Sequence, residues 1–511
     1  MADNTSNNKR IAKNTILLYV RMIVMMAISF YTTRVILNAL GETDYGIHNV
    51  VGGLVSMFML VSSSLSSSVS RFFTFALGKG DEKELSKTFA TSINIHFILA
   101  IIVIIFIETL GVWFLNNKMN IPEGRMDAAN WVLQLSALAF AINLIAVPFN
   151  AAIIAYEKMS AFAYMTIFDA TARLAIAFAT DYCNGDKLIV YSALCLIPPT
   201  TSLIIYWRYC TKKFKTCKYH YVWDNKMFKE IFAFAGWSFM GSLAGVAKNQ
   251  GVNLIINIFH GPIVNAARGI AMQVNSVVTH FITNFTMALN PQITKGYASG
   301  DLTRMHKLVF VGARFSYYLF LTITIPLLFE TNYVLTIWLK EVPDYTVVFT
   351  RLVLILTLCE IVSNTLITAQ AATGKIRNYQ LVVGFILLLN FPISYLLLYL
   401  GMPPESTLVA AIIISQICLL ARLYFLRSMA QLPAMRFLKE VYLNVIIVTA
   451  ISIIPPLLTS IIMQPSTSRF LTIGIVSVLS SLTCIYFIGC RKEERRICIN
   501  ILNKLKNKIL H

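Results

Sequence analysis

Residues 89–115 read FATSINIHFILAIIVIIFIETLGVWFL and carry one charged side chain, Glu108. Because about 20 apolar residues are enough to cross the hydrocarbon core as a helix, this stretch predicts a transmembrane span. Comparable stretches recur along all 511 residues, of which 57% are hydrophobic and 13% charged. A soluble domain has about 25% charged residues. The composition therefore excludes an ordinary soluble enzyme, a disordered scaffold and a secreted disulfide-rich module, and it predicts an all-α integral membrane protein.

Hydropathy, together with the breaks between apolar runs, predicts fourteen transmembrane helices. They are expected at roughly 14–36, 45–70, 89–115, 128–155, 161–181, 188–207, 231–258, 264–292, 309–330, 347–371, 379–400, 405–426, 441–463 and 469–489. The second of these ends in a serine-rich segment, SSSLSSSVS at 62–70, which lowers its hydropathy.

The distribution of basic residues supports this count. With the N-terminus in the cytoplasm, 31 of the 43 Lys and Arg residues fall in the head, the tail and the inner loops, against 7 in the outer loops and helix ends. Cytoplasmic loops are enriched in Lys and Arg, so both termini are predicted to be cytoplasmic. The net charge of +19 is then a topology signal, and it does not indicate a nucleic-acid partner. The remaining five basic residues lie within spans: Arg21, Arg173, Lys248, Arg314 and Arg351.

A basic stretch at 208–229, RYCTKKFKTCKYHYVWDNKMFK, separates the first six spans from the rest. The expected organisation is an N-lobe at 1–207, a basic cytoplasmic linker at 208–230, a C-lobe at 231–426, two further spans at 427–489 and a basic tail at 490–511. The tail places Ile497, Ile501, Leu505 and Ile509 four residues apart. That spacing suits either an amphipathic helix on the anionic cytoplasmic leaflet or a solubilised helical end without a role in transport.

Two pairs of segments suggest internal symmetry. LGETDYGI at 40–47 precedes SRFFTFALGKGD at 70–81, and HGPIVNAARGI at 260–270 precedes NPQITKGYASGD at 290–301. Six spans separate the two units, so both point the same way across the membrane. Parallel repeats of this kind predict two pseudo-symmetric six-helix lobes, with substrate handled between them.

These segments, with NTILLYVRMIVMMAISFYTTRVILNALGETDYGIHNVV at 14–51 and FAGWSFMGSL at 234–243, resemble bacterial polysaccharide-export flippases. That family belongs to the multidrug/oligosaccharidyl-lipid/polysaccharide (MOP) exporter superfamily. The resemblance implies a MATE-like fold that opens alternately inward and outward in the bacterial inner membrane. It also implies a cargo, undecaprenyl-pyrophosphate-linked oligosaccharide such as an O-antigen repeat unit, moved from the cytoplasmic to the periplasmic leaflet. Spans 13 and 14 would line a groove for the lipid tail.

The same resemblance bears on partners. It implies that the protein works in the lipid bilayer on a lipid-linked oligosaccharide, without enzymatic activity, and we expect it to act as a monomer. Glycan polymerase and glycosyltransferases are the candidate protein partners. Nine cysteines without a C-x-x-C pair and seven isolated histidines predict neither a cofactor nor a metal site.

Charged residues within the spans are the candidate site residues, because a charge at the bilayer centre costs about 2.5–3.5 kcal/mol and needs water or a partner. Arg21 lies about two turns into the first span and is predicted to face a cavity that binds the pyrophosphate; snorkelling to the inner surface is the alternative. Lys248 begins a polar row in the seventh span, which predicts one wet helix face or hydrogen bonds between lobes. The row continues with Asn249, Asn253 and Asn257.

Four further residues complete the candidate site. Arg34 and Arg268 occupy matching places near the outer membrane surface, where an arginine binds the pyrophosphate or anchors the interface. Glu360 lies in the middle of the tenth span and is the best candidate for a protonatable coupling carboxylate. Asp169 is the second candidate, although Arg173 lies four residues later and can neutralise it on the same helix face. Arg314 lies close enough to a span end to snorkel.

Three rival functions remain open at this stage. A cation-coupled multidrug exporter of the same superfamily would require a central acid that attracts cationic drugs. A membrane-bound glycan polymerase or acyl transferase would require a catalytic cluster in a large outer loop, and the predicted outer loops are short. A scaffold of a glycan-assembly complex would leave the charges in the spans unexplained.

Overall fold

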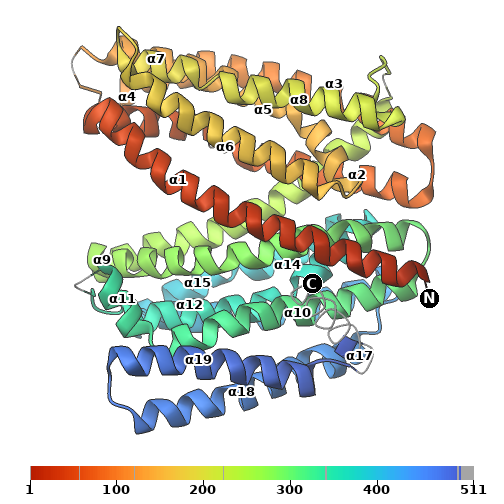
Figure 1. Ribbon diagram of the computed structural model, residues 1–511, viewed down its shortest axis with the longest axis vertical. Coiled ribbons are helices and arrows are strands. Elements are labelled where there is room, and N and C mark those ends of the chain that lie inside the picture. The colour runs from red at the N-terminus through yellow and green to blue at the C-terminus, as the bar shows by residue number, and fades with distance from the viewer. Residues whose placement is uncertain are drawn as a thin grey trace, which may run out of the picture. The chain divides into compact units, whose positions relative to one another are not determined.

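The computed structural model describes residues 2–56, 58–119, 121–122, 124–222, 224–339, 342–491 and 494–495. These ranges are almost entirely α-helical and contain no β-strand (Figure 1). Within them, eleven helical segments are long and apolar enough to cross a membrane. The chain is therefore a multi-pass all-α membrane protein, as its composition predicts.

Each of the eleven segments coincides with one of the fourteen predicted spans. The other three predicted spans are helical as well. The span at 14–36 contains the shorter apolar helix Leu17–Ser29. The span at 45–70 is divided between the end of α1 (Ala2–Ser56) and the start of α2 (Met59–Lys79). The span at 264–292 is a polar part of the long helix α9 (Asn225–Ala298).

The helices form two compact units. Unit 1 comprises Met1–Leu243 and Thr294–Gly300, and unit 2 comprises Ala244–Ile293 and Asp301–His511, so α9 contributes to both. Besides α1 and α2, unit 1 contains α3 (Glu82–Phe106), α4 (Val112–Lys118), α5 (Met126–Ala155), α6 (Met159–Asp181), α7 (Lys187–Leu194) and α8 (Ile197–Lys213). Unit 2 contains α10 (Leu302–Phe329), α11 (Thr331–Leu339), α12 (Thr346–Ile361), α13 (Asn364–Thr373), α14 (Arg377–Leu388), α15 (Asn390–Tyr399), α16 (Ser406–Ala430), α17 (Ala434–Phe437), α18 (Leu443–Ile462) and α19 (Thr467–Cys484).

The Gly-Asp pairs of the two repeated segments adopt the same local structure. Gly80 and Gly300 have φ of 74° and 78°, which glycine adopts without a steric penalty. The following Asp81 accepts hydrogen bonds from the backbone of Lys83 and Glu84 and caps α3. Asp301 caps α10 in the same way. A glycine turn followed by an aspartate cap therefore begins the third helix of each predicted repeat.

The apolar core of unit 2 holds the helices that carry the site. Ile256 of α9, Phe349 and Val353 of α12 and Ala411 of α16 belong to one buried cluster. A Cβ on Gly251 would lie 2.5 Å from the ring of Phe391, so glycine is needed for α9 to approach α15 this closely. This packing fixes the register of α9 against α12 and α16, and with it the polar side chains one turn away.

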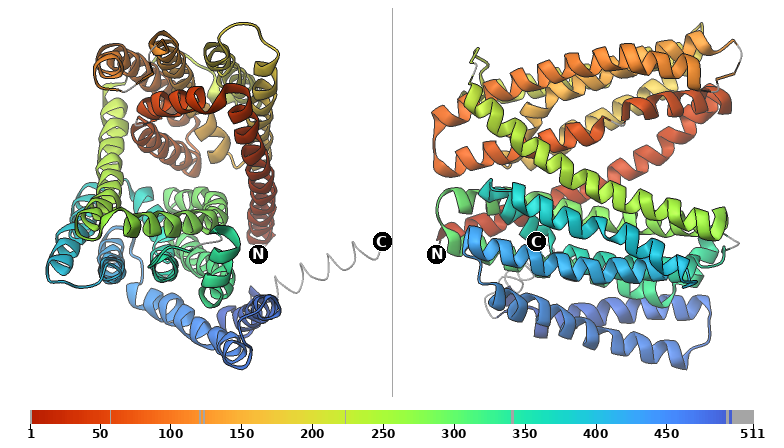
Figure 2. Two further views of the ribbon diagram at one scale, coloured as in Figure 1. Left: turned by 90° about the vertical axis from the view of Figure 1, so that its left-hand side faces the viewer. Right: turned by 180° about the vertical axis from the view of Figure 1, so that it is seen from behind.

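The last two spans pack as a hairpin against α10. Figure 2 shows α18 and α19 side by side in both of its views. The Tyr317 hydroxyl of α10 lies 2.9 Å from the Thr449 hydroxyl of α18. The Tyr318 hydroxyl donates to the side chain of Asn444 at the start of α18. The predicted lobe boundaries stay predictions. The apolar residues of the predicted amphipathic tail, Ile497, Ile501, Leu505 and Ile509, lie outside the described residues.

Candidate functional site

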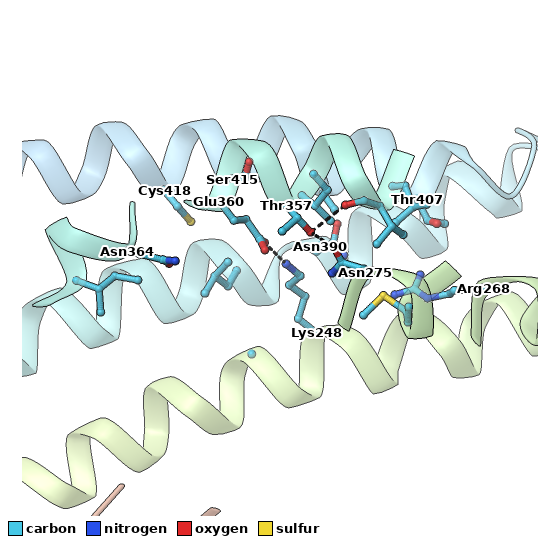
Figure 3. A pocket seen from close by; sticks show the side chains of 18 of the residues that line it. Lys248, Arg268, Asn275, Thr357, Glu360, Asn364, Asn390, Thr407, Ser415 and Cys418 are labelled. Carbon is cyan, nitrogen blue, oxygen red and sulfur yellow. Dashed lines mark hydrogen bonds and ion pairs between the residues drawn. The ribbon is translucent and has the colours of Figure 1, made fainter. Parts of the chain in front are cut away.

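A cavity of about 300 Å³ opens within unit 2, between α9, α12 and the helices from α13 to α16 (Figure 3). Its polar side chains come from segments as far apart as residues 248 and 422. They are Lys248, Arg268, Asn275, Thr357, Glu360, Asn364, Asn390, Thr407, Ser415 and Arg422. Ionisable residues within membrane spans usually face a cavity or a partner, and they often mark a substrate or ion pathway.

The ion pair between Lys248 and Glu360 crosses this cavity. The Lys248 Nζ lies 3.1 Å from the Glu360 Oε1, joining α9 to α12 (Figure 3). The lysine side chain is only 9% exposed, whereas the glutamate side chain is 42% exposed. A buried ammonium group requires a partner because removing it from water is costly. Glu360 is that partner, and its exposed edge still faces the cavity.

Arg268 is the second cation, and its donors are not all used. The residue is 4% exposed. Among the described residues, its Nε and Nη1 atoms are buried without a hydrogen-bond acceptor. Figure 3 shows the guanidinium at one end of the cavity. A buried guanidinium with unsatisfied donors is a strong site for an anion, because it can bind phosphate oxygens in a bidentate manner.

Arg422 of α16 is a third cation in the cavity, and it is not among the site residues predicted from the sequence. Its Nε donates to the hydroxyl of Tyr379, 3.1 Å away. Thr357 donates to the side chain of Asn275 across the same cavity, at 2.8 Å. Among the described lining residues there are three basic side chains and one carboxylate. The cavity is therefore net positive, and it suits an anion.

Arg422 lies near the cytoplasmic end of the span expected at 405–426, where a basic residue indicates topology and not a site. A pattern could have found it. Along α16, the cavity is lined at intervals of three and four residues, which places those side chains on one helix face. They are Leu408, Ala411, Ser415, Cys418 and Arg422.

Arg21 lies in unit 1, on α1, and does not line this cavity. Its guanidinium carbon lies 4.7 Å from the centre of the Phe162 ring of α6, within the range of a cation–π interaction. Within the described part of the chain, its Nε and Nη1 atoms are buried without a hydrogen-bond acceptor. Its predicted role in binding a pyrophosphate stays a prediction.

The other predicted residues divide into three groups. Asp169 and Arg173 form the predicted ion pair on α6, with 2.9 Å between Oδ2 and Nε. Asn253 is half-buried on α9 and is not among the residues that line the cavity. The side chains of Arg34, Asn249 and Asn257 lie outside what the structure describes. The structure thus brings together Lys248, Arg268 and Glu360 from the predicted set.

Unit 1 has a charge cluster of its own outside the spans. The Arg125 side chain donates to Asp44 at 2.9 Å and to Asp186 at 2.5 Å, joining three segments of the chain. The hydrogen bond from Arg125 holds the pKa of Asp186 below its ordinary value. Asp186 also caps α7. Because one guanidinium bridges two carboxylates from different segments, the cluster serves as a structural clamp.

The fold is that of transporters of the MOP superfamily. A MATE transporter in its bent conformation matches with a TM-score of 0.73 at 10% identity, covering 85% of this chain and 96% of that one. An outward-facing multidrug resistance MATE family transporter of the MOP superfamily matches with a TM-score of 0.70 at 12% identity, covering 83% and 97%. A MOP superfamily transporter from Pyrococcus furiosus, described by the reverse polarity of its binding pocket, matches with a TM-score of 0.70 at 11% identity, covering 84% and 96%.

The sequence places the chain within that class. A family model described as "Polysaccharide biosynthesis protein" matches residues 11–297, more than half of the chain. The chain belongs to this polysaccharide biosynthesis family. No curated protein matches the sequence. Family and fold together support a membrane flippase or exporter, as the resemblance implied.

Proposed function

We propose that this protein moves an undecaprenyl-pyrophosphate-linked oligosaccharide, such as an O-antigen or other surface-polysaccharide unit, from the cytoplasmic to the periplasmic leaflet. The observation that carries the proposal is the net positive cavity of unit 2. Arg268 offers unsatisfied donors there, and Lys248 and Arg422 add two further charges. The proposed location is the bacterial inner membrane, with both termini in the cytoplasm.

The charge of the cargo makes such a cavity useful. A diphosphate carries about two negative charges. When the cytoplasm is negative, the membrane potential favours moving these charges outward by about 2 × 2.3 kcal/mol per 100 mV. The barrier is the intermediate state, in which the phosphate oxygens have lost water. Cations that are already buried offset this loss without further desolvation of their own, and the membrane potential then favours release on the outer side.

The Lys248–Glu360 ion pair is the proposed arrangement of the cavity before cargo binds. Without cargo, Glu360 neutralises the buried lysine at 3.1 Å. A diphosphate entering the cavity competes with Glu360 for Lys248, and the carboxylate is exposed enough to remain hydrated when it is displaced. Glu360 is thus placed to couple cargo binding to a proton or to a conformational change. Asp169 is the weaker candidate for coupling, because Arg173 already neutralises it.

The rival function is a cation-coupled multidrug exporter, and the structural likeness to multidrug MATE transporters fits it as well. The charge of the cavity favours the flippase. A cationic drug would meet three cations and a single carboxylate that is already paired. In the Pyrococcus furiosus transporter, a binding pocket of reverse polarity is described as suggesting a different function. The same reasoning applied here favours an anionic cargo.

The test uses the native bacterium with the chromosomal copy replaced by variants. Lys248→Gln combined with Arg268→Gln is expected to trap lipid-linked glycan in the inner leaflet and to remove surface polysaccharide. Arg351→Gln is the matched control, because Arg351 is an exposed arginine of α12 that does not line the cavity. Normal surface polysaccharide from the double variant, at normal protein levels, contradicts the proposal. Increased sensitivity to cationic drugs, with glycan export unchanged, would favour the rival.

A further inference from the structure

A second cavity, of about 530 Å³, lies in unit 2 and is separate from the site above. Phe310 and Val311 of α10 and Pro433 form its apolar wall. Its other wall is cationic and includes Arg314 of α10 and Arg491. The cavity lies where α10 begins, where the span Ala434–Ile462 begins and where the span Thr467–Gly489 ends. The predicted topology puts these three helix ends on the same, cytoplasmic side of the membrane, which is the level of the lipid headgroups.

Arg314 is the deepest cation in this cavity. It is 1% exposed, so its guanidinium is held inside the protein. Its Nη2 lies 2.5 Å from the Glu494 Oε1, and its Nη1 donates to the Gly489 carbonyl at 2.9 Å. Its Nε is buried without an acceptor among the described residues. Glu494 therefore acts as an internal anion, and it still leaves one donor of the guanidinium unsatisfied.

The cavity and its immediate surroundings carry a positive surplus. Arg491 and Arg436 share the carboxylate of Glu440, with 2.9 Å from the Arg436 Nε to Oε1. Their side chains are 43% and 61% exposed, so both are accessible to a ligand. Among the described residues, three arginines face two carboxylates here: Arg314, Arg436 and Arg491 against Glu440 and Glu494.

We propose that this cavity binds the phosphate of an anionic membrane lipid. A cationic pocket with an apolar wall, at headgroup level between helix ends, matches a phosphodiester with its acyl chains beside α10. Positive residues concentrate at this end of the spans, which is the predicted cytoplasmic side. The arginine fork suits phosphate oxygens. Glu494 occupies part of the site, and the lipid phosphate competes with it for Arg314. The inference concerns a site apart from the cargo cavity and does not depend on which cargo is carried.

The experiment is native mass spectrometry of the full-length protein, purified in detergent and incubated with defined lipids. The wild type is expected to retain phosphatidylglycerol in preference to zwitterionic phosphatidylcholine. Arg436→Gln combined with Arg491→Gln should weaken the retention of phosphatidylglycerol about 30-fold, because each of the two surface cations contributes about 1 kcal/mol to anionic lipid binding. Arg427→Gln, an exposed arginine in the last turn of α16 outside the cavity, is the control and should change retention little.

A second variant should strengthen the retention of phosphatidylglycerol instead of weakening it. Glu494→Gln removes the internal competitor, and it should strengthen retention of phosphatidylglycerol several-fold while leaving that of phosphatidylcholine unchanged. If Arg314 and Glu494 had only a structural role, Glu494→Gln would not strengthen the retention of phosphatidylglycerol. Equal retention of the two lipids by the wild type contradicts the proposal, as does a double variant that binds like the control. Displacement of the lipid by inorganic pyrophosphate at micromolar concentration would assign the cavity to a soluble phosphate and would also contradict it.

Discussion

The Lys248 Nζ lies 3.1 Å from the Glu360 Oε1, although 112 residues separate the two along the chain. The pair is asymmetric, because the lysine is buried and the glutamate is 42% exposed. Removal of the glutamate therefore leaves a buried, unpaired charge, whereas removal of the lysine leaves a carboxylate that water can reach.

The first prediction follows from this asymmetry. Glu360→Gln should lower the free energy of unfolding by about 1–2 kcal/mol, less than for a fully buried pair because Glu360 is partly exposed. Lys248→Gln should lower it by less, and the double variant should recover part of the loss. Thermal unfolding in detergent measures all three. Equal losses from the two single variants would show that Lys248 is hydrated and not buried.

The same variant tests the coupling role. If Glu360 is the coupling carboxylate, Glu360→Gln should bind a polyprenyl diphosphate at least as tightly as the wild type but should lose the dependence of transport on a proton gradient. Asp169→Asn is the comparison, because Asp169 is paired on its own helix. Transport by proteoliposomes with and without a pH gradient provides the measurement. An unchanged gradient dependence in Glu360→Gln removes this residue from the coupling mechanism.

Close helix packing around Gly312 gives a stability prediction. A Cβ at this position would lie 2.2 Å from the side chain of Leu289 and 2.8 Å from that of Thr365. Gly312→Ala should therefore destabilise the protein by about 1–3 kcal/mol through overpacking. Gly474→Ala is the matched control in α19, because a Cβ there would have no described neighbour within 4 Å. Comparable unfolding temperatures for the two variants would contradict the packing described here.

Acid should loosen the clamp at Arg125. The pKa of Asp186 is lowered in the folded state, chiefly by the hydrogen bond from Arg125, so its stabilisation is fully present above its unfolded value near 4. That stabilisation is lost as the pH falls through the lower folded value. The difference in unfolding temperature between the wild type and Asp186→Asn should accordingly be largest at pH 6 and should shrink towards pH 3. A constant difference across this range would mean that the helix cap, and not the charge, accounts for the effect.

The sequence was enough to predict the helices because hydropathy is a local property, and all eleven long apolar segments fall where they were expected. It could not pair Lys248 with Glu360, because that contact depends on the register of α9 against α12. The role of Arg422 is hidden for a related reason: a basic residue near a span end resembles a topology signal until its helix face is known. Arg314 illustrates the limit best, since its partner Glu494 lies 180 residues away and only tertiary packing brings the two together.

The central claim is that the net positive cavity of unit 2 binds a diphosphate headgroup, and equilibrium binding tests it most directly. Purified full-length protein is titrated with a fluorescent polyprenyl diphosphate and with the uncharged polyprenol of the same length. The wild type should prefer the diphosphate, and Arg268→Gln should raise its Kd about 10- to 100-fold while leaving polyprenol binding unchanged, as expected for losing a charged hydrogen-bond donor. Arg351→Gln should bind like the wild type. Equal Kd values for the wild type and Arg268→Gln, or no preference for the diphosphate, would contradict the claim.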